Sequence, residues 1–442
     1  MANSLRRRLA AGLAVTGVVI SPGLVAGEAL AAQAPPGDVA VGTRLAAESD
    51  PAVQLIALDY TATVVVPQAG PRKTFAALRA QAGRHAKAKR IPGDQQSQLK
   101  WVLRKAAADV DRYLRPTGDD RRVRTSFGGA CTGWWITSDG YMVTGSHCVG
   151  SPKAQIRAGL AGKTLPKIGD GDVRTFLKEI SQVAQADDEL VRLTRSMFDR
   201  FNAKNMRVTG LKRYISLVSP LPGGGMDKTA KIRPLRLVAR GRDYPGEDFA
   251  LLKLAGARNL PTVPLGRDTD VRVGDTLYIN GFPGLITTST VFDLRSRLYP
   301  ALTEGAYNAN RTTVWNVPYI QAQAPSYPGN SGGPVFSREG KVIGMLIAGS
   351  PEPGGGVTEN HSFILPVGVV RKRLAAAGVT ARQSPTSRVY DSALDDFFAH
   401  RYRAALPKFR KVRALYPAHP YVAGYIADSR KAIAAGKDRS KH

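Results

Sequence analysis

The sequence predicts a mainly β protein of the sandwich or barrel type, with helical insertions and a small helical unit near the C-terminal end. Short runs rich in β-branched and aromatic residues recur along the chain, with turn residues between them. This pattern is typical of sandwiches and barrels. The predicted strands occupy 53–66, 133–137, 141–144, 213–218, 232–238, 249–254, 276–280, 313–317, 335–336, 342–348 and 362–365.

A turn signal joins two of these strands. Ser138, Asp139 and Gly140 separate 133–137 from 141–144. An Asp-Gly pair favours a tight β-turn because these residues tolerate positive φ. We therefore expect these two strands to form a β-hairpin.

Two segments show helical spacing instead. Leu99, Val102, Leu103, Ala106 and Val110 form one apolar stripe, and a longer amphipathic pattern runs over 172–201. We expect helical insertions at about 72–116 and 172–203 within a domain of residues 51–378, which a helix at 369–377 closes. A linker at 379–391, a helical hairpin at 392–436 and a basic tail at 437–442 complete the predicted order.

The first residues have the pattern of a signal peptide. Arginines at 6–8 precede an apolar run at 9–25, and small residues follow around 29–34. We expect residues 1–34 to be a cleaved signal peptide, residues 35–50 a linker, and the protein to be secreted or extracytoplasmic. The alternative is an uncleaved signal that anchors the chain in the membrane.

The charge of the chain is strongly basic. The 442 residues include 63 Lys and Arg against 35 Asp and Glu, a formal net charge of +28. Such a field favours anionic partners, of which a cell-wall polymer or a membrane surface is expected. No specific nucleic acid is expected, because no arginine-aromatic recognition pattern is present. The alternative is a solvated basic surface, and the insertion at 72–116 is open to both interpretations.

Two cysteines and six scattered histidines offer no zinc-type cluster, so we expect neither a metal nor a cofactor. In an exported protein Cys131 and Cys148 are expected to form one disulfide. Such a bridge would fasten the loop that contains His147 to the strand that contains Cys131.

The segment 327–334, with the sequence YPGNSGGP, carries the strongest chemical signal. A serine hydroxyl is a poor nucleophile unless a base lies beside it and preorganised donors lie opposite. The glycines around Ser331 allow backbone N–H groups to face a substrate carbonyl, as an oxyanion hole requires. Ser331 is therefore the candidate nucleophile.

A base and an orienting carboxylate occur upstream. His147 follows an apolar strand and is adjacent to Cys148, and Asp248 directly precedes the apolar strand 249–254. Asp243 is a rival for Asp248, but it lies in a Gly/Pro loop. The chain order His, Asp, Ser differs from the orders of subtilisin-like enzymes and α/β-hydrolases. An intact triad favours an endopeptidase or an esterase-like hydrolase, and the alternative is a catalytically silent scaffold that binds anionic or protein partners.

Residues 122–376 resemble the trypsin-like serine proteases, especially the bacterial Deg (high-temperature-requirement) branch. The resemblance lies in the motifs at 144–148, 248–252, 329–334, 342–344 and 363–367. It implies two six-stranded antiparallel β-barrels with the triad His147, Asp248 and Ser331 between them. It also implies an oxyanion hole formed by the N–H groups of Gly329 and Ser331.

The chain departs from this family in four respects, of which one is the long stretch between His147 and Asp248 that contains the insertion at 172–201. It lacks the usual activation site, Asn330 replaces the aspartate that would receive a freed N-terminus, and no PDZ-like domain is recognisable after Pro366. The C-terminal unit resembles a tetratricopeptide hairpin through residues between Tyr402 and Pro417.

The resemblance also implies a substrate pocket. Its floor is Pro325, followed by Ser326, with Ser362 on the opposite wall, and Ile347-Ala348-Gly349 would pair with the substrate backbone. An acidic floor would be needed to bind Lys or Arg side chains. We therefore predict an exported serine endopeptidase that cleaves protein or peptide substrates after small-to-medium apolar residues, whereas His361 would instead favour an acidic residue.

Overall fold

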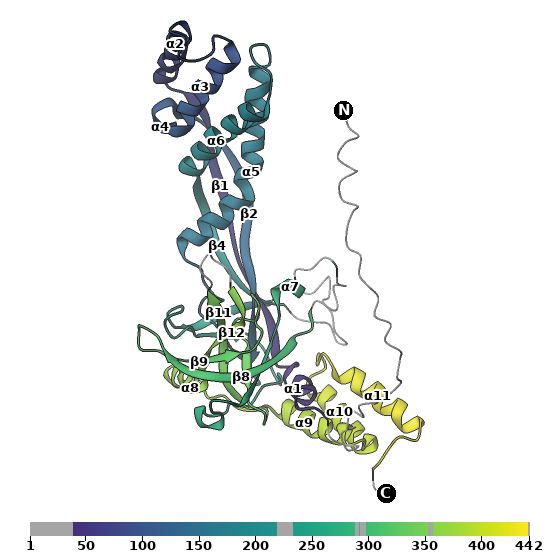
Figure 1. Ribbon diagram of the computed structural model, residues 1–442. Helices are drawn as coiled ribbons and strands as arrows, with labels where there is room; N and C mark the ends of the chain where they lie inside the picture. Colours follow the sequence, from purple (N-terminus) through teal and green to yellow (C-terminus); the bar gives the residue numbers. More distant parts are fainter. Residues whose placement is uncertain (1–38, 219–232, 288–290, 292–297, 352–356, 441–442) are drawn as a thin grey trace, which may run out of the picture. The chain divides into compact units, whose positions relative to one another are not determined.

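The computed structural model describes residues 39–218, 233–287, 291, 298–351 and 357–440 (Figure 1). The predicted signal peptide, residues 1–34, lies outside the described residues, as do the last two residues of the predicted basic tail. The described residues belong to one compact unit, Val39–His442.

Within the described residues, twelve antiparallel strands form two closed barrels, as the resemblance to the trypsin-like proteases implied. The first barrel has the order β1-β2-β3-β6-β5-β4 and the second β10-β11-β12-β9-β8-β7. The strands of the first barrel are β1 (Val53–Pro71), β2 (Leu114–Trp135), β3 (Tyr141–Thr144), β4 (Arg207–Val218), β5 (Arg233–Arg240) and β6 (Ala250–Leu254). Those of the second are β7 (Thr276–Gly281), β8 (Ala301–Thr312), β9 (Pro318–Gln323), β10 (Pro334–Phe336), β11 (Val342–Pro351) and β12 (Val357–Pro366).

Side-chain alternation fills each barrel. Every second residue of β1 from Ile56 to Val66 is buried in the first core, because successive side chains of a strand point to opposite faces. The second barrel has a core of its own, which includes Leu277 and Ile279. A further core that includes Trp134 and Phe336 joins residues of both barrels. The loops that carry the candidate catalytic residues therefore extend from a well-packed framework.

The predicted strand at 313–317 is wrong. These residues form the turn between β8 and β9, in which Thr313 N–H donates to Val317 O at 2.9 Å and Asn316 has a φ of 58°. The hydroxyl of Thr313 also accepts from Val317 N–H at 3.2 Å. Local hydrogen bonds of this kind compete with a sheet ladder. The strand was predicted because the β-branched residues at 312–314 are typical of strands.

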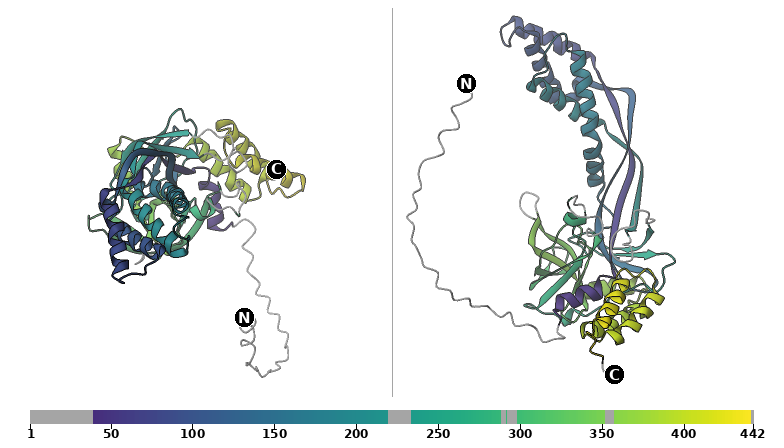
Figure 2. Two further views of the ribbon diagram at one scale, coloured as in Figure 1. Left: turned by 90° about the horizontal axis from the view of Figure 1, so that it is seen from above. Right: turned by 90° about the vertical axis from the view of Figure 1, so that its right-hand side faces the viewer.

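Two strands of the first barrel continue well beyond it. β1 pairs with β2 from Val53↔Trp134 to Pro71↔Leu114, so the two form one long ribbon. Figures 1 and 2 show helices gathered around the far end of this ribbon. They are α2 (Lys73–Lys87), α3 (Gln95–Ala108), α4 (Val110–Tyr113), α5 (Lys153–Glu179) and α6 (Asp188–Asn205). Leu103, Leu190 and Phe201 are among the residues of the separate core that holds these helices together.

The second helical insertion is larger than the sequence predicted. The expected insertion at 172–203 is part of two helices, of which α5 begins at Lys153. Pro166 and four glycines lower the helix propensity of 153–171, so the periodic signal is weak there. Tertiary packing outweighs that propensity. A Cβ on Gly159 would lie 2.1 Å from the ring of Phe127, so only glycine lets the helix approach the ribbon this closely.

The C-terminal region contains three helices rather than the predicted hairpin. After α8 (Val367–Ala376) come α9 (Pro385–Phe398), α10 (Tyr402–Leu415) and α11 (Val422–Ala434). Ser384 caps α9 by accepting from Ser387 N–H, so this helix begins inside the predicted linker 379–391. The likeness to a tetratricopeptide hairpin stays a prediction.

The predicted linker at 35–50 also contains a helix, α1 (Val41–Ser49), which packs against α9. Two shorter elements are η1 (Asp268–Asp270) and α7 (Gly284–Thr287). Across the described part of the chain, every helix is too short or too polar to cross a membrane.

Candidate active site

His147 and Asp248 face each other across neighbouring strands of the first barrel. His147 follows β3 and Asp248 precedes β6, and these strands pair with Thr144 opposite Ala250. The Nδ1 atom of His147 lies 2.7 Å from Oδ2 of Asp248, and the backbone N–H of His147 donates to Oδ1 at 3.0 Å. Asp248 is only 1% exposed. The carboxylate thus holds His147 by both its ring and its backbone N–H.

The electrostatic surroundings raise the pKa of His147 above its ordinary value of about 6.5. Burial alone would lower this pKa, and Arg240 opposes protonation as well. The hydrogen bond and the charge of Asp248, together with the charge of Asp243, outweigh both influences. The site therefore stabilises the imidazolium form of His147.

Asp243, the rival carboxylate, has other partners. The hydroxyl of Ser146 donates to its Oδ1, and Nη2 of Arg240 donates to the same atom at 2.9 Å. Arg240 Nε also donates to Oγ of Ser146 at 2.8 Å. This cluster supports the loop beside His147, whereas Asp248 contacts the imidazole itself.

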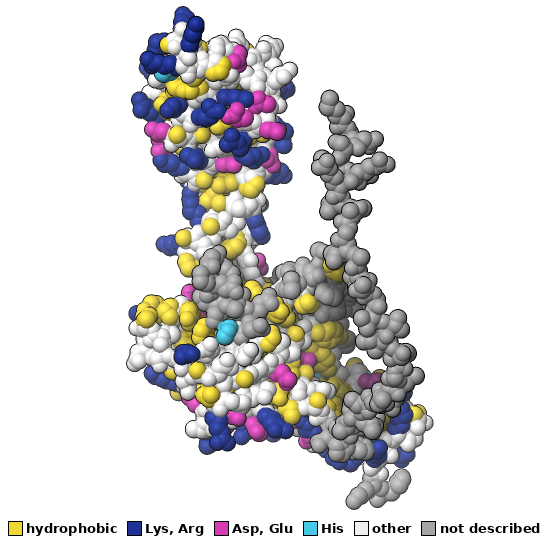
Figure 3. All heavy atoms as spheres, in the orientation of Figure 1, with side chains coloured by type: hydrophobic (Ala, Val, Ile, Leu, Met, Phe, Trp, Pro, Cys, Tyr) yellow, Lys and Arg dark blue, Asp and Glu magenta, His cyan; other side chains and the backbone are white. Residues whose placement is uncertain are grey.

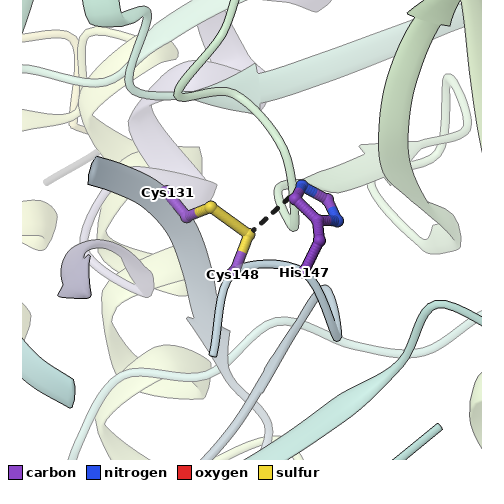
Figure 4. A group of neighbouring side chains, drawn as sticks. All are labelled: Cys131, His147 and Cys148. Carbon is purple, nitrogen blue, oxygen red and sulfur yellow. Dashed lines mark hydrogen bonds between the residues drawn. A yellow bond between two sulfur atoms is a disulfide. The ribbon is translucent and has the colours of Figure 1, made fainter. Parts of the chain in front are cut away.

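The structure contains the predicted Cys131–Cys148 disulfide, which joins β2 to the His147 loop (Figure 4). The two cysteines are 17 residues apart. Nε2 of His147 lies 3.6 Å from Sγ of Cys148. The three residues are close enough to hold an ion, but two sulfurs bonded to each other are not thiolates, which are the form that binds metal.

Ser331 lies in a tight turn between β9 and β10. Gly329 has a φ of 106°, and a Cβ at this position would lie 2.4 Å from the carbonyl oxygen of Phe282. Gly332 has a φ of 84°, and its Cβ would lie 2.3 Å from the carbonyl oxygen of Thr132. Both positions therefore require glycine. The turn is pressed against β2 and β7, which fixes the backbone around Ser331.

The backbone donors of this turn fall into two groups. The N–H groups of Asn330, Gly332 and Gly333 donate to protein carbonyls at 2.7–3.0 Å. Over the described residues, the structure records no such acceptor for the N–H groups of Gly329 and Ser331. These are the two donors that the resemblance predicts for an oxyanion hole.

One cavity of about 280 Å³ brings His147, Asp248 and Ser331 together. Within the described part of the chain, no hydrogen bond between Ser331 Oγ and His147 is recorded. Ser326 and Ile347, two of the predicted pocket residues, also line this cavity. The other lining residues are Asp243, the rival carboxylate, Tyr327 and Pro328 of the 327–334 motif, and Tyr244 and Leu346, which the sequence did not single out.

Tyr244 is the main lining residue of this cavity that the sequence analysis did not predict. Its ring packs edge-on against Tyr319, with centroids 5.6 Å apart, and stacks with Phe363 at 6.2 Å. Tyr319 and Phe363 lie on β9 and β12, far from Tyr244 in sequence. No local pattern marks Tyr244, because its position depends on these distant contacts.

Pro325 and Ser362, two further predicted pocket residues, are not among the described residues that line the cavity. The carbonyl of Pro325 accepts from Oγ1 of Thr303 at 2.9 Å. Ser362 is fully buried, and its Oγ donates to the carbonyl of Ala324 at 2.8 Å and lies 2.9 Å from Oγ of Ser326. Ala348 and Gly349 pair through their backbones with Phe363 and Ser362. His361 lies 3.3 Å from the Gln321 side chain and does not line the cavity.

Comparison with known protein families finds a match over part of the chain. Residues 217–345 match the family described as trypsin-like peptidase domain. The match contains Asp248 and Ser331 and begins after His147, which the long insertion separates from it.

Two curated relatives illustrate the similarity. A probable periplasmic serine endoprotease, DegP-like, of Pseudomonas putida is 36% identical over 128 residues, which are 28% of this chain and 24% of that protein. The mitochondrial serine protease HTRA2 of Bos taurus is 36% identical over 131 residues, 29% of this chain and 26% of that protein. The match thus spans about a quarter of each relative's length.

Among solved structures, the HtrA-type protease AlgW with a decapeptide has a TM-score of 0.36 and 16% identity. That alignment covers 77% of this chain and 67% of the other.

Proposed function

Because the chain carries a trypsin-like serine peptidase domain related to the Deg/HtrA proteases, we propose that it is a serine endopeptidase with the triad Ser331, His147 and Asp248. The observation that carries this proposal is the 2.7 Å contact between His147 Nδ1 and the buried Asp248, in the same cavity as Ser331. Such a pair fixes the tautomer that leaves Nε2 unprotonated. Nε2 is then the base available to a serine hydroxyl.

The reaction is an acyl transfer. Ser331 Oγ attacks the substrate carbonyl while its proton moves to Nε2 of His147, and the same proton then passes to the leaving amine. Asp248 stabilises the imidazolium formed between these steps. The N–H groups of Gly329 and Ser331, which have no backbone acceptor among the described residues, donate to the developing oxyanion. Water then attacks the acyl-enzyme through the same steps, with His147 as the base, and releases the second product.

One movement precedes the first step. Nε2 of His147 lies 3.6 Å from Sγ of Cys148 and must come within hydrogen-bond distance of Ser331 Oγ. Catalytic hydrogen bonds are often long or misaligned before substrate binds. A bound peptide would exclude water from the cavity and bring the two side chains together.

The lining of the cavity supports a preference for small-to-medium apolar side chains. Tyr244, Leu346 and Ile347 supply apolar surface, and Ser326 is uncharged. The ionisable side chains that line the cavity are already engaged: His147 with Asp248, and Asp243 with Arg240. An extended peptide would pair along β11 beyond Leu346, whose own N–H and carbonyl are bonded to Gly333 and Gly332.

An extracytoplasmic location is part of the proposal. The N-terminal sequence has the signal-peptide pattern, the two cysteines form a disulfide, and the Pseudomonas relative is named as periplasmic. Disulfides of this kind persist in oxidising compartments.

The test is a Ser331→Ala variant of the full chain, assayed with casein and with a fluorophosphonate label. The variant is expected to lose kcat by several orders of magnitude and to lose all labelling. Ser181→Ala, at an exposed serine of the helical insertion, is the matched control and should behave as wild type. A wild-type protein that neither cleaves casein nor takes up the label would instead be the silent scaffold. Labelling without casein cleavage would indicate an esterase-like hydrolase.

A further inference from the structure

The helices at the end of the ribbon carry many cations, but most of their carboxylates are already engaged. Asp94 accepts from Ser97 N–H at the start of α3, and Asp109 accepts from Arg112 N–H at the start of α4. Asp111 pairs with Lys204. Each acidic residue of 67–116 therefore has a partner within the helical insertions.

The acidic residues at the start of α6 form ion pairs with cations of α3. Asp187 accepts from Lys100 Nζ at 2.5 Å, and Glu189 pairs with both Lys100 and Arg104. These ion pairs join two helices of the insertion. They leave α2 and the turn after it without a compensating carboxylate.

Six exposed cations lie on α2 and that turn, and among the described residues none of them forms an ion pair. They are Lys73, Arg79, Arg84, Lys87, Lys89 and Arg90. No acidic residue occurs between Asp59 and Asp94. Figure 3 shows Lys and Arg side chains gathered over the α2 end of the insertion. We call these six residues the α2 basic surface.

We propose that the α2 basic surface binds an anionic lipid bilayer through its headgroups. The apolar side of α2, with Leu78 and Ala82, is buried in the helical core, so the helix has no apolar face to insert. The neighbouring groove is lined by residues such as Phe75 and Phe176 and by none of the six cations. The six cations therefore face outward from the helix and do not line the groove. This arrangement fits the flat surface of an anionic bilayer better than a polyanion bound along a groove.

Nucleic acid is the less suitable partner. Single-stranded nucleic acid binding relies on aromatic side chains on which bases stack. The one tryptophan near α2, Trp101, is packed against His85 at 5.1 Å and lies under Lys105. Electrostatic attraction to a membrane needs no such platform, and each Lys or Arg near an anionic leaflet increases binding about five-fold.

The test compares two charge-reversal variants of the full chain. One replaces Arg84, Lys87 and Arg90 on the α2 basic surface by Glu. The other replaces Arg410, Lys411 and Arg413 by Glu, three exposed cations of α10 without ion pairs among the described residues. Both variants change the net charge equally. Binding is measured by co-sedimentation with phosphatidylglycerol–phosphatidylcholine vesicles and with phosphatidylcholine vesicles alone.

The wild type and the α10 variant should bind the anionic vesicles, and the α2 variant should bind them at least about ten-fold more weakly. High salt should weaken the binding of the wild type as well. Equal losses in both variants, or equal binding to neutral vesicles, would overturn the proposal. Binding to inorganic polyphosphate but not to vesicles would overturn it in favour of a soluble polyanion.

A second observation points to a positioning residue. Thr132 on β2 is fully buried and contacts both candidate catalytic loops. Its N–H donates to Ser331 O at 2.9 Å, and its Oγ1 donates to Gly329 O at 2.8 Å and accepts from Phe282 N–H at 3.0 Å. Its carbonyl accepts from Oγ1 of Thr144, at the start of the His147 loop, at 2.7 Å.

We infer that the hydroxyl of Thr132 positions the oxyanion hole. By holding the Gly329 carbonyl, it fixes the peptide plane between Gly329 and Asn330 and so the direction of the neighbouring donors. The adjacent Trp134 acts in the same direction, since its Nε1–H donates to Gly332 O at 3.1 Å. This inference rests on the proposed peptidase function.

The test is Thr132→Val, which removes the hydroxyl at similar volume, with Thr132→Ser as the rescue variant. We expect kcat to fall about 10- to 100-fold in the valine variant with KM nearly unchanged, and the serine variant to recover most of it. Thr164→Val removes another buried hydroxyl, one that donates to Leu160 O within α5, and should leave kcat unchanged. An active wild type with an equally active Thr132→Val variant would refute the role of Thr132. An inactive wild type would refute the peptidase.

Discussion

His147 titrates under two opposing influences. Burial and Arg240 favour the neutral ring, and the buried carboxylate of Asp248 favours the imidazolium. The net effect is a raised pKa. Since the proposed mechanism needs the neutral imidazole as the base, activity should be lost on acidification at a higher pH than for an ordinary histidine.

Asp248→Asn tests this at the residue scale. Without the carboxylate, the pKa of His147 should fall, so the acidic limb of the kcat/KM profile should move to lower pH. The rate should drop about 10,000-fold, because an amide no longer enforces the productive tautomer. A pH–rate profile of wild type and variant provides the measurement. Asp243→Asn is the control and should cause a smaller loss, and the reverse ranking would assign the orienting role to Asp243.

Residues differ in how far the sequence predicts them. His147, Asp248 and Ser331 stand in short motifs, because their chemistry requires a glycine-rich turn or the end of an apolar strand. The positions of Tyr244 and Thr132 do not depend on a particular local sequence. They matter through contacts with Phe363 and Gly329, more than 100 residues away, and such contacts leave no local pattern.

At the scale of elements, most barrel strands with alternating apolar residues were predicted, whereas β8 and β9 (Pro318–Gln323) were missed. β8 (Ala301–Thr312) was missed because only Tyr307 is buried among its fully described residues. The first half of α5 was missed for a related reason. Its glycines oppose helix formation locally, and only the ribbon and α6 explain why they are needed.

For the molecule as a whole, the C-terminal helices are joined to the barrels through polar contacts. Oγ1 of Thr262 accepts from Ser384 N–H at 2.7 Å, and Thr262 N–H donates to Oγ of Ser387 at 2.8 Å. On another side, α1 packs against α9 and Arg44 pairs with Asp395. The sequence predicted a separate unit because 379–391 is polar, but polarity here reflects buried hydrogen bonds.

An acidic cluster lies where α1 meets these helices. Burial, together with the nearby charges of Glu48 and Asp395, raises the pKa of Asp391 to about 8, against the opposing effects of Gln383 and Arg44. Burial likewise raises the pKa of Asp50 to about 7, although Asn280 donates to it. Burial also raises the pKa of Glu48. Asp50 and Asp391 are therefore partly protonated near neutral pH in the folded chain.

The sign of the resulting pH dependence follows from linkage. An unfolded aspartate titrates near 4, so a folded pKa of about 7 or 8 stabilises the fold at low pH and this stability is lost as the pH rises through the folded values. His419 acts oppositely, since burial lowers its pKa to about 3, but that effect is complete above about pH 7. Between about pH 7 and pH 9 the urea midpoint of the wild type should therefore fall. Asp391→Asn should reduce the fall, whereas Asp428→Asn, at an exposed carboxyl of α11, should not. Identical pH slopes in all three proteins would show that the cluster does not control the attachment of α1 and the C-terminal helices.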